Sequence, residues 1–217
     1  MKQADKKQVK GRRDPSRTRR ALLKAGLELF STHGFAGSTI EQIAQRAKVN
    51  KALISYYFGG KQGLQDAIHL ETFRLFDPRI SILPSRDGKA VDDLHAFIGA
   101  FIGLAESDSD YPVMLLRGLI SGEADPEGIF ATRALELNRV LREILEKGYK
   151  AGQFRKADPL LTQVSIVGSL LFFFATAASR RRMFEVGRFD KEPPTTEQYI
   201  DHLQELVLHG LIAAPTD

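Results

Sequence analysis

Apolar residues recur at helical spacing in four short segments before residue 77, and only a few residues separate one segment from the next. The first segment begins at Asp14-Pro15, where aspartate can cap free backbone amides and proline suits the first helical position. It ends at Gly34, because glycine adopts the left-handed conformation of a helix end at little cost. These helix start and end signals indicate a group of short helices packed together.

The second and third segments are the shortest, and a tight turn separates them. Ser38 or Thr39 can cap the second helix, which Val49-Asn50 interrupts after a few turns. Asn50 is in turn a good cap for a third helix over residues 51–58. We therefore predict two consecutive short helices between residues 39 and 58.

The helical period persists to the end of the chain. Gly59-Gly60 ends the third helix, and a fourth runs from residue 61 to about 76, before Asp77-Pro78. No stretch alternates with period two over the length of a strand. Further helices are predicted at about residues 91–105, 113–121, 126–150, 159–182 and 195–211. The predicted fold class is therefore all-α.

The charge of the chain is gathered at its beginning. The 217 residues are 43% hydrophobic, which is enough for a core, and the net charge of +4 is too small for a polycation that coats nucleic acid. Lysine and arginine nevertheless dominate the residues before Ala21. We expect residues 1–13 to form a flexible basic arm, which is either a solvated tail or a segment that binds phosphate groups.

Several function classes are excluded by what the sequence lacks. The absence of cysteine rules out disulfides, thiol nucleophiles, zinc fingers and iron–sulfur clusters, and it fits a reducing cytoplasm. The basic N-terminus is not followed by the apolar run of a signal peptide. The five histidines lack metal-ligand spacing, and no phosphate-binding glycine loop or nucleophile elbow is present. We expect a cytoplasmic protein that is not an enzyme and holds no metal or cofactor.

The third predicted helix has the residue types of a helix that reads the major groove. Ile54 and Phe58 stand one turn apart and can anchor it inward. The side chains then expected to face outward are those of Lys51, Leu53, Ser55 and Tyr56. A lysine can reach a guanine edge or a phosphate, and leucine or tyrosine can contact a thymine methyl group. Tyr57 and Lys61 would meet the sugar-phosphate chain.

The segment from residue 39 to 58, followed by Lys61 and Leu64, resembles the N-terminal domain of the TetR family of regulators. That family's pattern reads roughly T-x-x-x-I-A-x-x-A-G-V-S-x-x-x-L/I-Y-x-Y-F-x-x-K-x-x-L, and most of its fixed points are met here in register. The resemblance implies a helix-turn-helix DNA-binding domain at residues 14–77 and a larger helical ligand-sensing and dimerisation domain at residues 78–217. It also implies a sequence-specific transcription regulator, and for most of the family a repressor.

The residues predicted to contact DNA are Thr39, Asn50, Lys51, Ala52, Leu53, Ser55, Tyr56, Tyr57 and Lys61. Two positions depart from the family pattern. Lys48 replaces the glycine of the turn, so the turn either manages without a positive φ or tolerates the strain of a side chain there. Ser55 replaces a tyrosine and removes an aromatic contact to DNA. Glu41 lies where some members read a base, and it could accept only from a cytosine amino group.

Residues 164–178 form the most apolar stretch of the chain. A bilayer core needs about 20 apolar residues, so we favour a buried helix with one face on its own domain and the other on a partner subunit. The resemblance implies that the last two long helices form the interface of a homodimer. Such a dimer would place two recognition helices about 34–36 Å apart, which is one turn of DNA, or a multiple of that distance, and its operator would be a partial palindrome.

A pocket for an unknown small-molecule effector is expected between the middle helices. The candidate walls are Phe73, Phe76, Phe97, Phe101, Met114, Phe130 and Phe172, each of which could equally be plain core. Arg117 could anchor an acidic or carbonyl-bearing ligand, or it could be simply exposed or ion-paired. An effector releases DNA only if it prefers the arrangement in which the recognition helices are mis-spaced. The helix from residue 61 to 76 would be the lever.

Two other functions remain open at this stage. A transcriptional activator would have the same fold. An architectural protein that binds DNA regardless of sequence would need a broad basic surface, which the confinement of positive charge to one end does not favour.

Overall fold

The computed structural model describes residues 14–75, 77–123 and 125–212. Within these residues every regular element is a helix, and a single β-bridge pairs Phe154 with Ile212. The predicted all-α class is confirmed. The helices are α1 (Pro15–His33), α2 (Ile40–Ala47), α3 (Ala52–Phe58), α4 (Lys61–Phe73), α5 (Asp77–Ile80), α6 (Ala90–Ala100), α7 (Ile102–Glu106), α8 (Asp110–Ser121), α9 (Ile129–Lys150), α10 (Pro159–Ala175), α11 (Ala177–Glu185) and α12 (Thr196–Leu211).

Side-chain caps place the first two helices. Asp14 accepts a hydrogen bond from the backbone amide of Ser16 at the start of α1. Thr39, not Ser38, caps α2, and it does so in a reciprocal capping box with Gln42. Ser38 is buried instead, and its hydroxyl donates to the carbonyl of Gly34 over 2.8 Å. The caps therefore fix both ends of the loop between α1 and α2.

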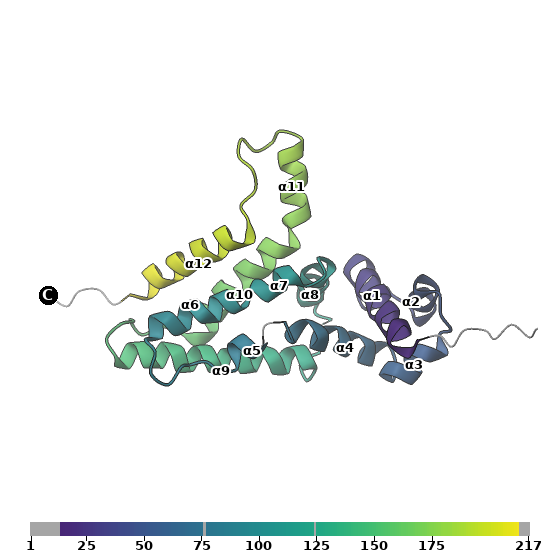
Figure 1. The fold of residues 1–217 in the computed structure, drawn as a ribbon, viewed down its shortest axis with the longest axis horizontal. Coiled ribbons are helices and arrows are strands. Elements are labelled where there is room, and N and C mark those ends of the chain that lie inside the picture. Colours follow the sequence, from purple (N-terminus) through teal and green to yellow (C-terminus); the bar gives the residue numbers. More distant parts are fainter. Residues whose placement is uncertain (1–13, 76, 124, 213–217) are drawn as a thin grey trace, which may run out of the picture.

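The helices α1, α2 and α3 gather at one end of the molecule, and α4 leads from them into the remainder (Figure 1). Their shared core is completely closed to solvent. Its fully buried members are Leu22, Phe30, Ile43, Ile54 and Leu64. At about 25 cal/mol per Å² of apolar surface, such a core accounts for most of the stability that helices this short have. Helix α8 packs against α1 and joins this group to the rest.

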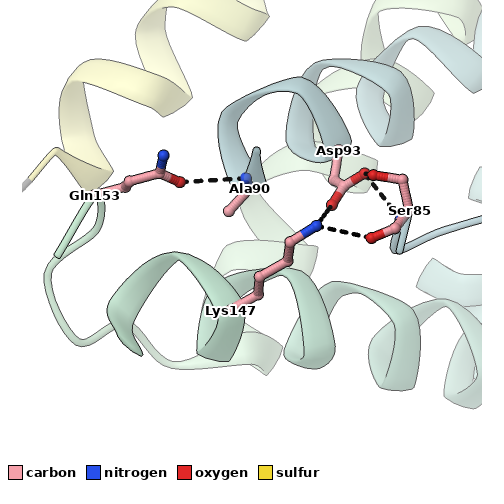
Figure 2. A network of polar contacts seen from close by, with 5 residues as sticks. All are labelled: Ser85, Ala90, Asp93, Lys147 and Gln153. Atoms are coloured by element: carbon pink, nitrogen blue, oxygen red, sulfur yellow. Dashed lines mark hydrogen bonds and ion pairs between the residues drawn. The ribbon is translucent and has the colours of Figure 1, made fainter. Parts of the chain in front are cut away.

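The larger part of the fold is organised around α9, which packs against α4, α6 and α10. A polar network within it links α9 to α6 and to the loop before α6 (Figure 2). The Lys147 ammonium group donates to a carboxylate oxygen of Asp93 over 2.7 Å and to the carbonyl of Ser85 over 2.8 Å. Burial alone would raise the pKa of Asp93, but the hydrogen bonds from Lys147 and Ser85 lower it below its usual value.

Two of the predicted helices are each divided in the structure. The helix expected at residues 91–105 breaks at Phe101 into α6 and α7, and α7 approaches the backbone of Leu75 so closely that a Cβ on Gly103 would lie 3.0 Å from it. The helix expected at residues 159–182 breaks at Thr176, where α10 and α11 meet at a bend of 50°. Sequence periodicity missed both breaks because the apolar pattern continues through them.

A stack of three side chains holds the bend between α10 and α11. The Arg180 guanidinium lies 3.9 Å from the ring centroid of Phe173, which stacks on Tyr199 of α12 with centroids 3.8 Å apart. Arg180 also donates to the carbonyl of Phe173 and to the hydroxyl of Thr176. As a result α11 projects away from the body of the protein (Figure 1).

Helix α10 is only partly covered. Its residues Leu161, Val164 and Phe172 are each more than 60% exposed. For the described part of the chain, no helix taken singly has both the length and the apolar character to cross a bilayer, whereas α10 and α11 meet those two criteria jointly as a bent pair.

Candidate DNA-binding interface

Helix α3 is anchored by one side chain and exposes most of the others. Ile54 is fully buried, as predicted, and Phe58 is half-buried against the core. Tyr56 is 79% exposed, and Lys51, Ala52 and Ser55 also face solvent. Asn50 begins the helix by accepting a hydrogen bond from the amide of Ala52 over 2.9 Å. The outer face of α3 is therefore free to meet a flat or convex partner.

Two of the residues expected to contact DNA project less than predicted. Leu53 is half-buried and packs against the core, so most of its side chain faces the protein. Tyr57 is also half-buried, and its ring meets that of Tyr56 edge-on with centroids 5.0 Å apart. Leu53 and Tyr57 stand four positions apart on α3, so the two side chains lie on the same face of the helix, at the edge of the core.

The turn between α2 and α3 shows how Lys48 is accommodated. Its φ is 56° and its ψ is 43°, which is the left-handed conformation that glycine would adopt without strain. Its amide donates to the carbonyl groups of Ala44 and Gln45 and so ends α2. Of the two explanations that the sequence left open, the turn keeps the positive φ and tolerates the strain, which costs about 1–2 kcal/mol.

An ion pair spans the outer face between α2 and α3. The Lys51 ammonium group lies 2.8 Å from a carboxylate oxygen of Glu41, and both side chains are about two-thirds exposed. The hydrogen bond from Lys51 lowers the pKa of Glu41, and the same contact raises the pKa of Lys51. The Lys51 ammonium group therefore lies beside a carboxylate on this outer face.

Lys61 has partners that the sequence did not indicate. Its ammonium group donates to the carbonyl oxygens of Phe35 and Ser38, each over 2.9 Å, and lies 4.2 Å from the centroid of the Phe35 ring. It thus joins the start of α4 to the loop between α1 and α2. We predicted a phosphate contact for Lys61, and in this structure its charge is directed at the loop. No side chain caps the start of α4.

Most of the predicted contact residues surround one open hollow beside α3. The hollow has a volume of about 610 Å³. Its lining includes Thr39, Glu41, Asn50, Lys51, Ala52, Ser55 and Lys61. Leu53, Tyr56 and Tyr57 lie outside it.

The predicted effector residues are scattered rather than gathered in one pocket. Phe97 and Phe101 pack edge-on in the closed core, and Phe73 stacks on His69. Met114 and Phe130 do line a common cavity. Phe172 is 63% exposed on α10, Arg117 faces solvent, and Phe76 lies outside the described residues.

That cavity lies between α4, α8, the α8–α9 loop and the start of α9, and its volume is about 30 Å³. Its most buried polar member is His69, which is 7% exposed and lies 3.0 Å from the Tyr111 hydroxyl through its Nδ1 atom. Burial lowers the pKa of His69 to about 4 and raises that of Tyr111. Both groups are therefore neutral at neutral pH. Sequence patterns do not predict this pair, because the two residues are 42 positions apart.

Known proteins share both the local pattern and the whole fold. The family described as "Bacterial regulatory proteins, tetR family" matches residues 22–68. The transcriptional repressor NicS of Pseudomonas putida is 28% identical over 206 residues, covering 90% of this chain and 92% of its own. The transcriptional regulator BetI 1 of Chromohalobacter salexigens is 49% identical over 49 residues, which cover 23% of this chain and 24% of its own.

Solved structures extend the likeness to the full length of the fold. A tetR-family regulatory protein from Rhodococcus RHA1 aligns with a TM-score of 0.69 and 20% identity, covering 91% of this chain and 98% of its own. The hemolysin II transcriptional regulator HlyIIR aligns with a TM-score of 0.66 and 21% identity, covering 93% and 100%. Three observations agree with one another. They are the exposed face of α3, the register of residues 39–64 and the likeness to these relatives. Residues 22–68 therefore carry the pattern of the tetR family, and the chain has the fold of the solved regulators.

Proposed function

We propose that this protein is a ligand-responsive repressor that binds a partially palindromic operator as a homodimer. The observation that carries the proposal is the outer face of α3, where Lys51, Ser55 and Tyr56 are exposed beside a hollow. Repression is supported by NicS, which is named as a transcriptional repressor and matches over most of the chain. Residues 14–77 would form the DNA-binding domain and residues 78–217 the ligand-sensing and dimerisation domain.

Within the DNA-binding domain, α3 would enter the major groove while α2 lies over the backbone. Tyr56 would contact a thymine methyl group or a base edge, and Lys51 a guanine or a phosphate. The uncapped amides at the start of α4 would bind a phosphate, which suits the positive end of a helix. Thr39, Asn50, Ala52 and Tyr57 would supply further contacts that set the register. The basic arm lies outside the described residues.

The homodimer would form through α10 and α12. Leu161 and Val164 of α10 and Leu206 of α12 are each at least 60% exposed, which is a large apolar surface for a monomer to leave in water. A hollow of about 400 Å³ lies between the two helices and is lined by Leu161, Leu203 and Leu206, among others. The same two helices of a second copy would cover this surface in a four-helix arrangement.

Control by an effector would pass through α4. This helix begins beside α3, packs against α9 and lines the cavity that holds His69. A ligand that prefers one position of α4 shifts the spacing of the two recognition helices, and a tenfold to hundredfold loss of operator affinity needs about 1.4–2.8 kcal/mol of coupling.

The proposal is tested by selecting bound sequences from a random duplex pool with the purified protein. We expect one partial palindrome to be enriched, and Tyr56→Ala to weaken binding to it by about tenfold or more, or about 1.4 kcal/mol. Tyr149→Ala is the matched control, because Tyr149 is also exposed but lies on α9. Weak binding without enrichment, which fades as salt rises, would refute operator recognition. A reporter gene behind the selected site then separates repression from activation.

A further inference from the structure

The turn between α2 and α3 holds a lysine in a conformation for which the rest of the described chain uses glycine. Lys48 is the only residue other than glycine that has a positive φ among the described residues. The other described positions with a positive φ are Gly34, Gly59, Gly60, Gly122, Gly152 and Gly187. Glycine would fill the turn without strain, and strained backbone is concentrated at functional sites. The strain at position 48 therefore points to a role for the lysine side chain.

That role does not lie in holding the turn together. The Lys48 amide donates to the carbonyl groups of Ala44 and Gln45, and the Val49 amide donates to that of Ala44. These hydrogen bonds join main-chain atoms only, so they would be the same with glycine at position 48. The side chain is exposed and has no hydrogen-bond or ion-pair partner in the described part of the chain. What the lysine adds to the turn is an unpaired positive charge.

The other cations of the same region already have partners. Arg46 and Lys51 each form an ion pair with a glutamate, over 2.7 and 2.8 Å. Lys61 donates to two backbone carbonyl oxygens. Lys48 is the fourth lysine or arginine of residues 34–61, all of which the structure describes, and it alone has no such partner. Lys48 can therefore meet an anion without giving up an existing contact.

The place of the turn indicates which anion the charge meets. In a helix-turn-helix the recognition helix lies in the major groove, and the helix before it crosses the sugar-phosphate chain. The turn that joins α2 to α3 must then pass the edge of the groove, which is lined by phosphates. Asn50 and Lys51 follow two and three residues later and line the hollow beside α3. The flexible stem of a lysine can carry its ammonium group to such an edge.

We propose that the Lys48 ammonium group contacts a DNA phosphate at the edge of the major groove, and that the strained turn serves this contact. The inference rests on the operator binding proposed above and adds a contact residue to it. Because the family pattern has glycine at this position, the contact is particular to this chain. A phosphate contact fixes the register of α3 and strengthens binding to any duplex, but it carries no sequence information of its own.

The experiment replaces Lys48 by asparagine, which is uncharged and adopts the left-handed conformation more readily than most residues. The affinity of the full-length protein is measured for the selected operator and for scrambled DNA over a range of salt concentrations. We expect Lys48→Asn to weaken binding to both duplexes by the same factor, about fivefold for each lysine near 100 mM salt. The slope of log affinity against log salt should become shallower by about 0.9 for each lysine lost. The melting temperature without DNA should not fall.

Two further variants separate charge from backbone strain. Lys48→Arg keeps a long cationic side chain in the same strained turn, so it should retain the affinity and the salt slope of the unsubstituted protein. Lys150→Asn is the matched control, because it changes the net charge equally at an exposed position on the end of α9 that lies far from α3 (Figure 1). It should alter neither quantity.

Duplexes in which one phosphate is replaced by a neutral methylphosphonate locate the contact. At the phosphate that Lys48 meets, this change should weaken binding of the unsubstituted protein by about fivefold and should leave Lys48→Asn almost unaffected. If every methylphosphonate weakens the two proteins equally, Lys48 contacts none of the phosphates.

The outcomes separate this inference from the proposed function. The Lys48 contact is overturned if Lys48→Asn binds both duplexes as the unsubstituted protein does, or if Lys48→Arg loses as much affinity as Lys48→Asn. Operator recognition then remains. If no operator is enriched, the proposed function fails. The salt slope on random duplexes then still decides whether Lys48 meets a phosphate.

Discussion

Helices α3 and α10 are both left partly uncovered, but they expose opposite chemistry. At α3 and its N-cap the exposed side chains include Lys51, Ser55 and Tyr56, and the buried anchor is Ile54. On α10 the free side chains are Leu161, Val164 and Phe172. Polar groups at the first surface can exchange water for phosphate and base edges, whereas the apolar second surface gains free energy only by leaving water. The polar surface and the apolar surface therefore favour different kinds of partner, and a single chain can present both.

The largest expected effect comes from placing a charge on the apolar surface. Val164→Glu would bury an unpaired carboxylate in the proposed dimer, so we expect the dimer dissociation constant to rise at least about 100-fold, or about 2.7 kcal/mol. Analytical ultracentrifugation measures the change, and operator affinity should fall with it. Leu135→Glu is the control, since Leu135 is 72% exposed on α9. If Val164→Glu remains a dimer, α10 is not the interface.

A smaller effect is the pH dependence of stability that comes from His69, in the core between the two surfaces. The pKa of His69 is lowered to about 4, so the unfolded chain binds a proton more readily and the unfolding free energy falls as pH drops through this range. The unfolding free energy is not reduced by this group above about pH 6.5. Near pH 4 the unfolding free energy is lower by at most about 3 kcal/mol. Urea denaturation across this range measures it.

His69→Gln should remove that pH dependence, because glutamine does not titrate and can still reach Tyr111. His202→Gln, at an exposed position, is the control. An unchanged pH profile in His69→Gln would contradict the assignment.

Removing the ion pair between Glu41 and Lys51 tests how the polar surface at α3 selects its DNA. Glu41→Gln frees Lys51 and removes a negative charge from the face that meets phosphate. We expect binding to scrambled DNA to strengthen by a few-fold, corresponding to about 1 kcal/mol, and discrimination in favour of the operator to decrease. Fluorescence anisotropy with both duplexes measures the ratio. Glu143→Gln on α9 removes a carboxylate that also pairs with an arginine, and it should change neither affinity.

The smallest effect lies in the turn beside α3. Lys48→Gly relieves the left-handed strain but adds freedom to the unfolded chain, so the unfolding free energy should rise by at most about 1 kcal/mol. Thermal unfolding measures the change. A loss of stability would mean that the lysine side chain contributes a contact worth more than the strain.

The sequence predicted the N-terminal group well because its signals are local. Asp14 and Thr39 cap the helices expected of them, and Gly34 ends α1 with a positive φ. Asn50 accepts a hydrogen bond from the Ala52 amide, but the N-cap residue of α3 is Lys51, whose side chain makes no capping bond. The prediction was weaker where the cause is a distant contact. After the break at Phe101, α7 lies against the backbone of Leu75, which is distant in sequence. The partners of Lys61 are backbone carbonyls, which leave no mark on residue identity.

The candidate effector residues show the same limit. Phe73, Phe97, Phe101 and Phe130 were recognised as apolar, but periodicity does not say which of them border a void and which fill the core. The polar lining of the cavity was missed entirely, because Asp66 and Glu123 look like ordinary surface acids until α4 and the α8–α9 loop come together.

The contact of Lys61 with two backbone carbonyls has a consequence for how the protein can change over generations. Phe35 and Ser38 accept through atoms that every amino acid carries, so neither position must keep its residue type for the hydrogen bonds to survive. Lys61 has no such freedom, since only a long cationic side chain spans the gap. These two hydrogen bonds would therefore survive substitutions in the loop, whereas replacing Lys61 by a short or uncharged residue would remove both of them.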